Sequence, residues 1–208
     1  MSKTAKDHWA HFHNTKRAGA LSGTAFKRVV ELFSLDVRPG MDVLNIGVGL
    51  GHCTRGFVAA GCNMYVMDIC EEAVNKVANV TSGSFLHEKS SELPDSKFDL
   101  IYSFLVTQHM SEDDILLQFP NVIRSLKPGG KFYVQFAGSD RPGENNNPNH
   151  IVGKLGDKGV SILGGRMVRS QDYAIALVER CGGKVVKAES LKKFPQRESY
   201  WYYLVVQK

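Results

Sequence analysis

Short apolar runs alternate with amphipathic segments along most of the chain, beginning near residue 42. A short apolar run is typical of a buried strand, whereas apolar residues that recur every three or four positions are typical of a helix. The pattern predicts strands at Asp42–Ile46, Asn63–Met67, Ser84–Glu88, Phe98–Phe104, Lys131–Phe136, Lys184–Ser190 and Tyr200–Val206. It predicts helices at about residues 51–60, 70–79, 112–126 and 170–181.

Strands that alternate with helices predict a mainly parallel sheet, because right-handed crossovers return the chain over a face of the sheet between strands. No helical pattern separates the last two strands, only residues 191–199, so these two can pair as an antiparallel edge. The predicted fold class is therefore α/β: a doubly wound, mainly parallel seven-stranded sheet with an antiparallel C-terminal edge strand.

The N-terminal region and one long connection lie outside this alternation. In the N-terminal region, residues 5–17 and 22–34 both have helical patterns, whereas the connection at residues 138–169 is rich in Gly, Asn and Pro. A connection of this length is usually either a functional loop or a poorly ordered one. Since 208 residues suit one continuous core, we expect residues 1–208 to form a single domain.

Composition limits the setting of the protein. The first residues contain no apolar leader, and no stretch approaches the ~18 apolar residues that span a bilayer, so we expect a cytoplasmic protein without a membrane partner. The four cysteines show no CxxC spacing, which favours reduced and mostly buried thiols.

Charge is unevenly distributed along the chain. Residues 42–123 carry four basic and eleven acidic side chains, whereas residues 124–208 carry fifteen and seven. The basic flanks can attract an anionic acceptor or a nucleic acid, although an ordinary solvated surface has the same composition.

The first predicted strand runs into three alternating glycines, Gly47, Gly49 and Gly51, and then into a helix that begins near His52. Glycine is needed where the backbone takes unusual torsions or where a ligand approaches too closely for a Cβ atom. The dinucleotide fingerprint would place its third glycine where His52 stands, which disfavours NAD or FAD. The chain also lacks the P-loop motif.

Asp68 ends the second predicted strand. A carboxylate there can accept hydrogen bonds from both hydroxyls of a ribose that lies across the strand ends. Alone, Asp68 could equally cap the helix that begins at Cys70. Together with the glycine loop, it favours ribose binding.

Three later segments complete an ordered series: residues 84–94 lead into residues 98–110, and a Pro-Gly-Gly turn at residues 126–132 follows. With the glycine loop, this series resembles the class I S-adenosylmethionine (SAM)-dependent methyltransferases over about residues 40–137. The resemblance implies a Rossmann-like fold, SAM as cofactor and an enzyme that transfers a methyl group.

The resemblance also assigns cofactor-binding residues. It implies that Gly47, Gly49 and Gly51 line the methionine part of SAM, that Asp68 holds the ribose, that Ile69 packs on the adenine, that Lys89 and Ser90 lie near the adenine amino group, and that Phe104 offers backbone to the methionine amine. Two positions depart from the family. Asn45 stands where an acidic residue is usual, and Lys89 or Glu88 stands where an aspartate is frequent. Asn45 can still accept a hydrogen bond through its carbonyl, without the charge.

His109 is the candidate catalytic residue. In similar methyltransferases the pair formed by Gln108 and His109 faces the methyl-transfer pocket, and a histidine can remove a proton from an oxygen or nitrogen acceptor at neutral pH. Alternatively, His109 caps the helix near Ser111 or only shapes the pocket. We expect no metal site, because the spacing of His8, His11 and His13 cannot bring all three onto one helical face.

The segments outside the SAM half are expected to meet the acceptor. Residues 1–37 are interpreted as an N-terminal helical lid and residues 138–169 as an acceptor-side loop. Basic side chains in that loop would suit a carboxylate, phosphate or sugar acid: Arg141, His150, Lys154, Lys158, Arg166 and Arg169. A solvated loop without such a role is the alternative.

A small-molecule or glycan acceptor, possibly anionic, is the first hypothesis, because the covering segments are short and no recognition domain is added. An RNA or protein methyltransferase that uses the basic flanks is the enzymatic alternative, with nucleic acid possible but not favoured. The non-enzymatic alternative is a regulatory protein that binds SAM without catalysis. Asn45 favours this alternative, because it stands where the family usually has an acidic residue. The GxGxG spacing disfavours a nucleotide-dependent oxidoreductase.

Overall fold

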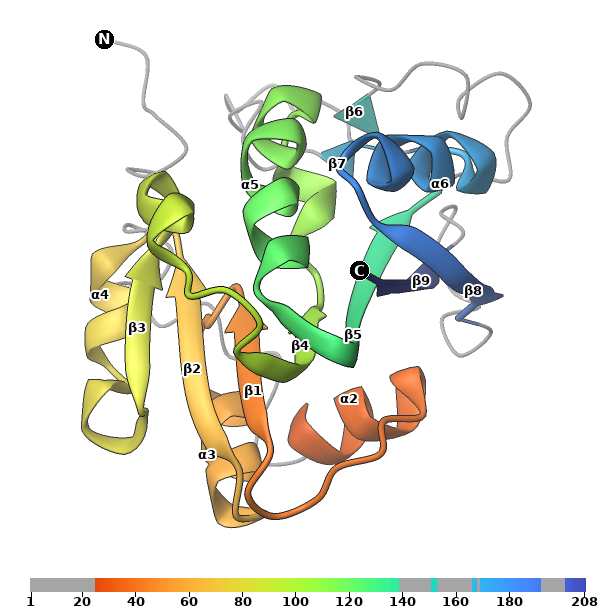
Figure 1. Ribbon diagram of the computed structural model, residues 1–208. Coiled ribbons are helices and arrows are strands. Elements are labelled where there is room, and N and C mark those ends of the chain that lie inside the picture. The colour runs from red at the N-terminus through yellow and green to blue at the C-terminus, as the bar shows by residue number, and fades with distance from the viewer. Residues whose placement is uncertain (1–24, 139–150, 153–165, 168, 192–200) are drawn as a thin grey trace, which may run out of the picture.

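The computed structural model describes residues 25–138, 151–152, 166–167, 169–191 and 201–208. Its centre is a seven-stranded sheet with the order β3-β2-β1-β4-β5-β9-β8, and a separate pair joins β6 to β7 (Figure 1). The strands are β1 (Asp42–Ile46), β2 (Asn63–Asp68), β3 (Gly83–Leu86), β4 (Phe98–Ser103), β5 (Leu126–Ala137), β6 (Ile151–Val152), β7 (Arg166–Met167), β8 (Lys184–Ser190) and β9 (Trp201–Gln207). The five neighbouring strands β3, β2, β1, β4 and β5 are parallel to one another.

Helices cover both faces of the sheet (Figure 1). The α-helices are α2 (Ala25–Phe33), α3 (His52–Ala59), α4 (Glu71–Asn75), α5 (Glu112–Arg124) and α6 (Gln171–Arg180), and the 3-10 helices are η1 (Ala78–Val80), η2 (His87–Glu92) and η3 (Thr107–His109). Helices α5 and α6 share one apolar cluster with alternate residues of the central strands, and α2 and α3 share another on the opposite face. The predicted α/β, doubly wound class is confirmed.

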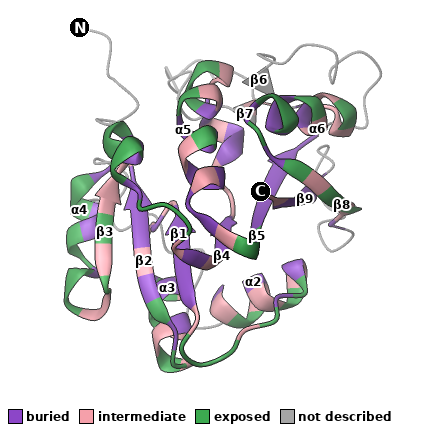
Figure 2. Ribbon diagram, in the orientation of Figure 1, coloured by how far each residue is buried: buried purple, intermediate pink, exposed green. Residues whose placement is uncertain are grey.

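The core strands are buried on both faces, which is why they appear in the sequence as continuous apolar runs (Figure 2). All five residues of β1 are buried, and β5 is buried without interruption from Phe132 to Ala137. The edge strand β8 alternates exposed with partly buried residues instead, and its charged side chains suit an open edge.

The antiparallel pair expected at the end of the chain is present. Strand β9 pairs antiparallel with both β5 and β8. The C-terminal strand therefore lies one place inside the sheet, and the strand at the very edge is β8. The physical reason is hydrophobicity: six consecutive residues of β9, from Trp201 to Val206, are buried, which an edge position would expose.

The chain leaves the predicted pattern at several element ends. The helix expected at residues 70–79 is shorter in the structure: the α-helix α4 ends at Asn75, and the separate turn η1 follows at Ala78–Val80. Val77, Asn79 and Val80 are weak helix formers, which favours this break. The third strand ends at Leu86 rather than at residue 88, because η2 begins at once.

The structure describes only part of the N-terminal helices and of the acceptor-side loop that the sequence predicts. Helix α2 forms within the helix expected at residues 22–34, and its Val29 and Phe33 are fully buried in the core. The helix expected at residues 5–17 lies outside the described residues. Within the predicted acceptor-side loop, β6 and β7 form a short antiparallel ladder. The single-domain, lid and loop assignments stay predictions.

All four cysteines lie in the described part of the chain and are free thiols, three of them buried. Burial raises the pKa of Cys53 to about 11, so this thiol stays protonated at neutral pH. The prediction that the cysteines are mostly buried is confirmed.

Candidate functional site

The candidate cofactor residues lie at or just beyond the carboxyl ends of four adjacent parallel strands. The glycine loop follows β1, Asp68 ends β2, η2 follows β3 and Phe104 follows β4. Because these strands are neighbours in the order β3-β2-β1-β4, segments far apart in the sequence meet at one edge of the sheet (Figure 1). This is the edge at which open α/β sheets bind ligands.

All three glycines of the loop have left-handed backbone torsions, with φ of 82° at Gly47, 58° at Gly49 and 76° at Gly51. Two of them also allow close packing. A Cβ atom at Gly47 would come within 2.1 Å of the Val106 side chain, and one at Gly51 within 2.2 Å of Val77. These two glycines let the segments after β4 and α4 contact the loop directly.

Gly49 differs from its neighbours because no atom of the described residues lies within 4 Å of the position that its Cβ atom would occupy. Its left-handed torsion still favours glycine. Packing against described side chains thus explains Gly47 and Gly51, whereas the space beside Gly49 is left open by that part of the chain. A ligand can approach the backbone there.

Asp68 is 5% exposed and fixes the shape of the loop. Its Oδ2 accepts a hydrogen bond from the Val48 amide at 2.7 Å, and its Oδ1 accepts one from the Cys70 amide at 2.9 Å. The carboxylate therefore connects the end of β2 to the glycine loop and to the start of α4. Each carboxylate oxygen can accept a second hydrogen bond, which leaves capacity for a ligand hydroxyl.

Asn45 is buried beneath the loop, and its amide nitrogen donates to the Thr54 hydroxyl in α3 at 3.1 Å. This bond ties β1 to the helix that follows it. The neutral side chain suits an enclosed position, because a carboxylate here would carry a desolvation cost.

Lys89 and Ser90 both lie in η2, but their side chains differ. Lys89 is exposed, with its ammonium 3.9 Å from the Glu92 carboxylate, and its φ of −109° marks a kink between two turns. The Ser90 hydroxyl is buried and accepts from the Asn121 amide of α5 at 3.3 Å. Ile69 is partly buried and packs against the small apolar cluster around α4.

The chain turns sharply after β4. Leu105 has a φ of 66°, a left-handed torsion that is unfavourable for a leucine, and its amide donates to Oε1 of Gln135 at 2.9 Å. The Phe104 ring packs edge-on against Phe33 of α2, with 5.8 Å between ring centroids. The strained turn presses Val106 against Gly47 and so closes one wall of the site.

His109 ends η3 and is partly buried. Its Nε2 lies 3.1 Å from Nε2 of Gln108. An amide nitrogen can only donate, so in this arrangement the ring nitrogen is the acceptor. The alternative in which His109 caps the next helix is wrong, because Ser111 caps α5 in a reciprocal capping box with Asp114.

Two residues that hold this turn were not expected from the sequence. Gln135 is a polar residue within an apolar strand, and that interruption is the signal that could have identified it. Arg169 was interpreted as an acceptor-side cation, but its side chain is fully buried and bonds to backbone carbonyls of the turn. The side chains of the other basic residues predicted to meet the acceptor lie outside the described part of the chain.

Within the described ranges, no group of three or more His, Cys, Asp or Glu side chains could hold a metal ion, and His8, His11 and His13 fall outside those ranges. None of the helices that the structure describes is long and apolar enough to cross a membrane.

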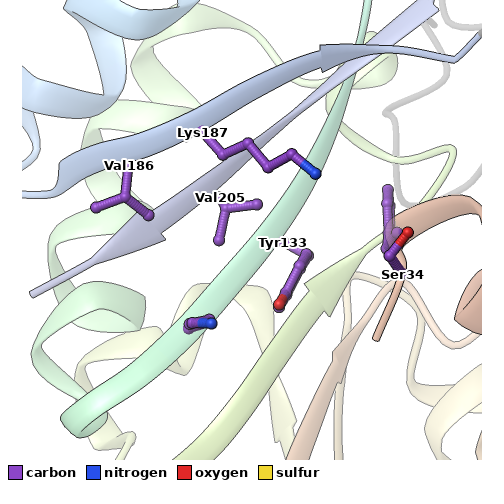
Figure 3. A pocket seen from close by; sticks show the side chains of 7 residues that line it. Ser34, Tyr133, Val186, Lys187 and Val205 are labelled. Atoms are coloured by element: carbon purple, nitrogen blue, oxygen red, sulfur yellow. The ribbon is translucent and has the colours of Figure 1, made fainter. Parts of the chain in front are cut away.

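A hollow of about 340 Å³ lies on the α2 side of the sheet, between the end of α2 and strands β5, β9 and β8. Tyr133, Val205, Lys187 and Ser34 are among its lining residues (Figure 3). None of the predicted site residues lines it, so it is separate from the strand-end site.

Comparisons with known proteins agree with this geometry. Residues 44–134 match the family model of a methyltransferase domain. The chain is 26% identical over 185 residues to a sterol 24-C-methyltransferase of Aspergillus fumigatus, covering 81% of this chain and 46% of that one. It is 30% identical over 110 residues to the phosphoethanolamine N-methyltransferase of Plasmodium falciparum, covering 50% and 41%. The chain thus spans less than half the length of these curated relatives.

Solved structures share the fold. The 1,6-didemethyltoxoflavin-N1-methyltransferase of Burkholderia thailandensis, solved with its substrate and S-adenosylhomocysteine (SAH), has a TM-score of 0.73 and 15% identity, covering 98% of this chain and 86% of that one. A TehB-like SAM-dependent methyltransferase of Corynebacterium glutamicum has a TM-score of 0.62 and 18% identity, covering 98% and 97%. The chain has the Rossmann-like α/β fold of these methyltransferases. Its residues 44–134 carry a methyltransferase domain of the class I SAM-dependent kind, for which SAM is the cofactor.

Proposed function

We propose that this protein transfers a methyl group from SAM to an oxygen or nitrogen of a small-molecule acceptor. The observation that carries the proposal is the strand-end site, in which Gly49 opens onto free space beside a buried Asp68. The family match over residues 44–134 supports it.

The residues at this edge fit the cofactor in a definite order. The loop of Gly47, Gly49 and Gly51 would line the methionine part. Within the described residues the space beside Gly49 is open to a ligand, and Gly47 and Gly51 give the loop its shape through their close contacts with Val106 and Val77. Asp68 would accept from the ribose hydroxyls with the lone pairs that the Val48 and Cys70 amides leave unused. Asn45 would act beneath them by fixing β1 to α3.

The adenine end follows from β2 and β3. Ile69 would pack on the ring, and Lys89 and Ser90 would border its amino group. An ammonium only donates hydrogen bonds, as the adenine amino group does, so the Lys89 side chain cannot be the acceptor for that group. At the other end, backbone of Phe104 would accept from the methionine amine.

SAM supplies a methyl group on a sulfonium, which an acceptor attacks in line. The chain can contribute by orienting the acceptor and by removing its proton. We assign the second role to His109, whose Nε2 is placed to accept a hydrogen bond. Its Nε2 lone pair is engaged by Gln108, so the amide must rotate before this nitrogen takes a proton.

Relatives support the small-molecule class of acceptor. The names of the matched proteins specify a sterol, phosphoethanolamine and a toxoflavin precursor as substrates of those enzymes. A glycan or an anionic acceptor is compatible with the same site. Arg169 does not support anion binding, because both of its terminal nitrogens bond to the backbone.

The test is SAH production from SAM over a panel of amines, phenols, carboxylates and sugars. At least one small molecule is expected to give turnover, and His109→Asn is expected to lower kcat by about 100-fold while SAH affinity stays unchanged. The pH profile of kcat should lose its acid limb in that variant. SAH binding without turnover on any acceptor would overturn the assignment in favour of a non-catalytic SAM-binding protein.

A further inference from the structure

Arg169 is one of the largest side chains that are fully buried in the described part of the chain. Its Nη1 donates to the carbonyl of Thr107 at 3.1 Å, and its Nη2 donates to the carbonyl of Met110 at 2.7 Å. These two carbonyls flank Gln108 and His109. One guanidinium thus fixes both ends of the turn η3.

The backbone of Arg169 is anchored on the sheet. Its amide donates to the carbonyl of Ala137, the last residue of β5, at 2.8 Å. Its carbonyl accepts from the Tyr202 hydroxyl of β9 at 2.9 Å. The side chain therefore extends from a fixed point on two core strands to the turn after a third strand, β4.

The charge of Arg169 is not neutralised by a direct ion pair among the described residues. Glu112 contributes to its surroundings, but the two oxygens of this carboxylate accept from Arg180 at 3.0 Å and from the Tyr173 hydroxyl. Burial lowers the pKa of Arg169, although Tyr202, Tyr173 and Glu112 oppose that shift. A buried cation carries a desolvation cost that an apolar side chain of similar volume avoids. Packing alone therefore does not explain an arginine here, whereas the two directed bonds do.

We propose that Arg169 is a positioning residue that holds Gln108 and His109 in place by fixing the backbone of the turn that carries them. This deepens the proposed function and rests on it for the role of His109. Gln135 fixes the start of the same turn, since its side chain accepts from Leu105 and its carbonyl accepts from the Thr107 hydroxyl. Arg169, the last residue of the predicted acceptor-side loop, fixes the end.

Titration of the histidine side chains by NMR tests this role in the full chain. His109→Asn identifies the His109 signal. In Arg169→Met, the pKa of His109 is expected to shift by at least about half a unit, because the turn that carries the imidazole loses both bonds from the guanidinium and its surroundings change. Arg169→Gln should give a similar shift and decides the question even where the methionine variant does not fold. Arg169→Lys keeps the charge without the two-pronged guanidinium, so it should also shift the pKa of His109. A wild-type value in Arg169→Lys would show that the charge acts rather than the two bonds and would overturn the proposal.

Tyr202→Phe is the matched control. It removes the hydroxyl that donates to the Arg169 and Ser170 carbonyls but leaves the guanidinium intact. It should lower the melting temperature without moving the pKa of His109. A neutral substitution of Arg169 that lowers only the melting temperature, with the His109 titration unchanged, would show that the arginine is merely structural and would overturn the proposal.

SAH titrated into the same samples separates this inference from the proposed function. Its affinity should stay within about threefold in every Arg169 variant, because the guanidinium bonds to none of the residues assigned to the cofactor. Wild-type protein that fails to bind SAH would refute the proposed function. Normal SAH binding with an unmoved His109 would refute only the role of Arg169.

Discussion

The imidazole of His87, the first residue of η2, faces α5, where its Nδ1 is 3.2 Å from the amide nitrogen of Gln118. Its Nε2 is buried and has no hydrogen-bond partner among the residues that the structure describes. Burial lowers the pKa of His87, although the carboxylates of Asp68, Asp114 and Glu88 oppose that shift. The folded protein therefore keeps this ring neutral at a pH at which the unfolded chain already binds a proton.

Stability should consequently fall as the pH drops below the ordinary histidine pKa. For a fully neutral His87, the loss between pH 7.5 and 5.5 is about 1.4 kcal/mol. In His87→Asn, the side-chain oxygen can accept from Gln118, and this part of the pH dependence should disappear. Urea unfolding of both proteins at the two pH values measures the difference, and an identical loss in the variant would contradict the assignment.

At the scale of the residue, the sequence revealed the groups that have a recognisable pattern. Gly47, Gly49, Gly51 and Asp68 could be identified because a strand, a glycine turn and a second strand occur in a fixed order. The strain at Leu105 left no such signal, since any residue type can stand after a strand. The burial of Arg169 was equally hidden, because its partners are backbone carbonyls of a turn that lies ~60 residues earlier in the chain.

At the scale of the element, charged side chains join the beginnings of β1, β4 and β5 at the sheet edge opposite the site. The Asp42 carboxylate lies 3.0 Å from the Lys127 ammonium and 3.1 Å from that of Lys97, and Lys127 also contacts Asp99 at 2.8 Å. Burial raises the pKa of Asp42, but hydrogen bonds from Lys127 and Lys97 outweigh it, and the net pKa is lowered.

Asp42→Asn should therefore destabilise the fold by about 1–2 kcal/mol at pH 7, because it removes two charge-assisted bonds from a mostly buried group. A lowered folded pKa stabilises above the unfolded value, so the difference between the two proteins should shrink below about pH 4. Asp36→Asn, at an exposed ion pair with Arg38, should change stability by less than about 0.5 kcal/mol. Equal effects of the two substitutions in chemical denaturation would contradict the account.

The elements themselves were largely predictable, because strands buried on both faces require continuous apolar sequence. The boundaries that moved depend on tertiary contacts. Strand β5 begins at Leu126 rather than at residue 131, since Leu126 pairs with Phe98 and the intervening Pro-Gly-Gly turn is accommodated as a register shift. Local periodicity cannot show such a pairing.

At the scale of the whole molecule, the two ends of the parallel strands have separate roles. One end holds the charged cluster around Asp42, and the other gathers the glycine loop, Asp68, η2 and the turn with His109. The order of the strands decides this gathering, and it follows from the alternation of strand and helix. The acceptor does not follow from it, because fold does not specify function and the segments expected to meet the acceptor carry no shared pattern.

The most direct test of the central claim is calorimetric titration of SAH into wild-type protein, Gly49→Ala and Gly129→Ala. Both glycines have positive φ, 58° and 79°, and neither has an atom within 4 Å of its Cβ position, so both substitutions impose similar backbone strain. The account predicts micromolar SAH binding by the wild type, unchanged in Gly129→Ala and at least about tenfold weaker in Gly49→Ala. Folded wild-type protein that does not bind SAH, or equal affinity in both variants, would contradict it.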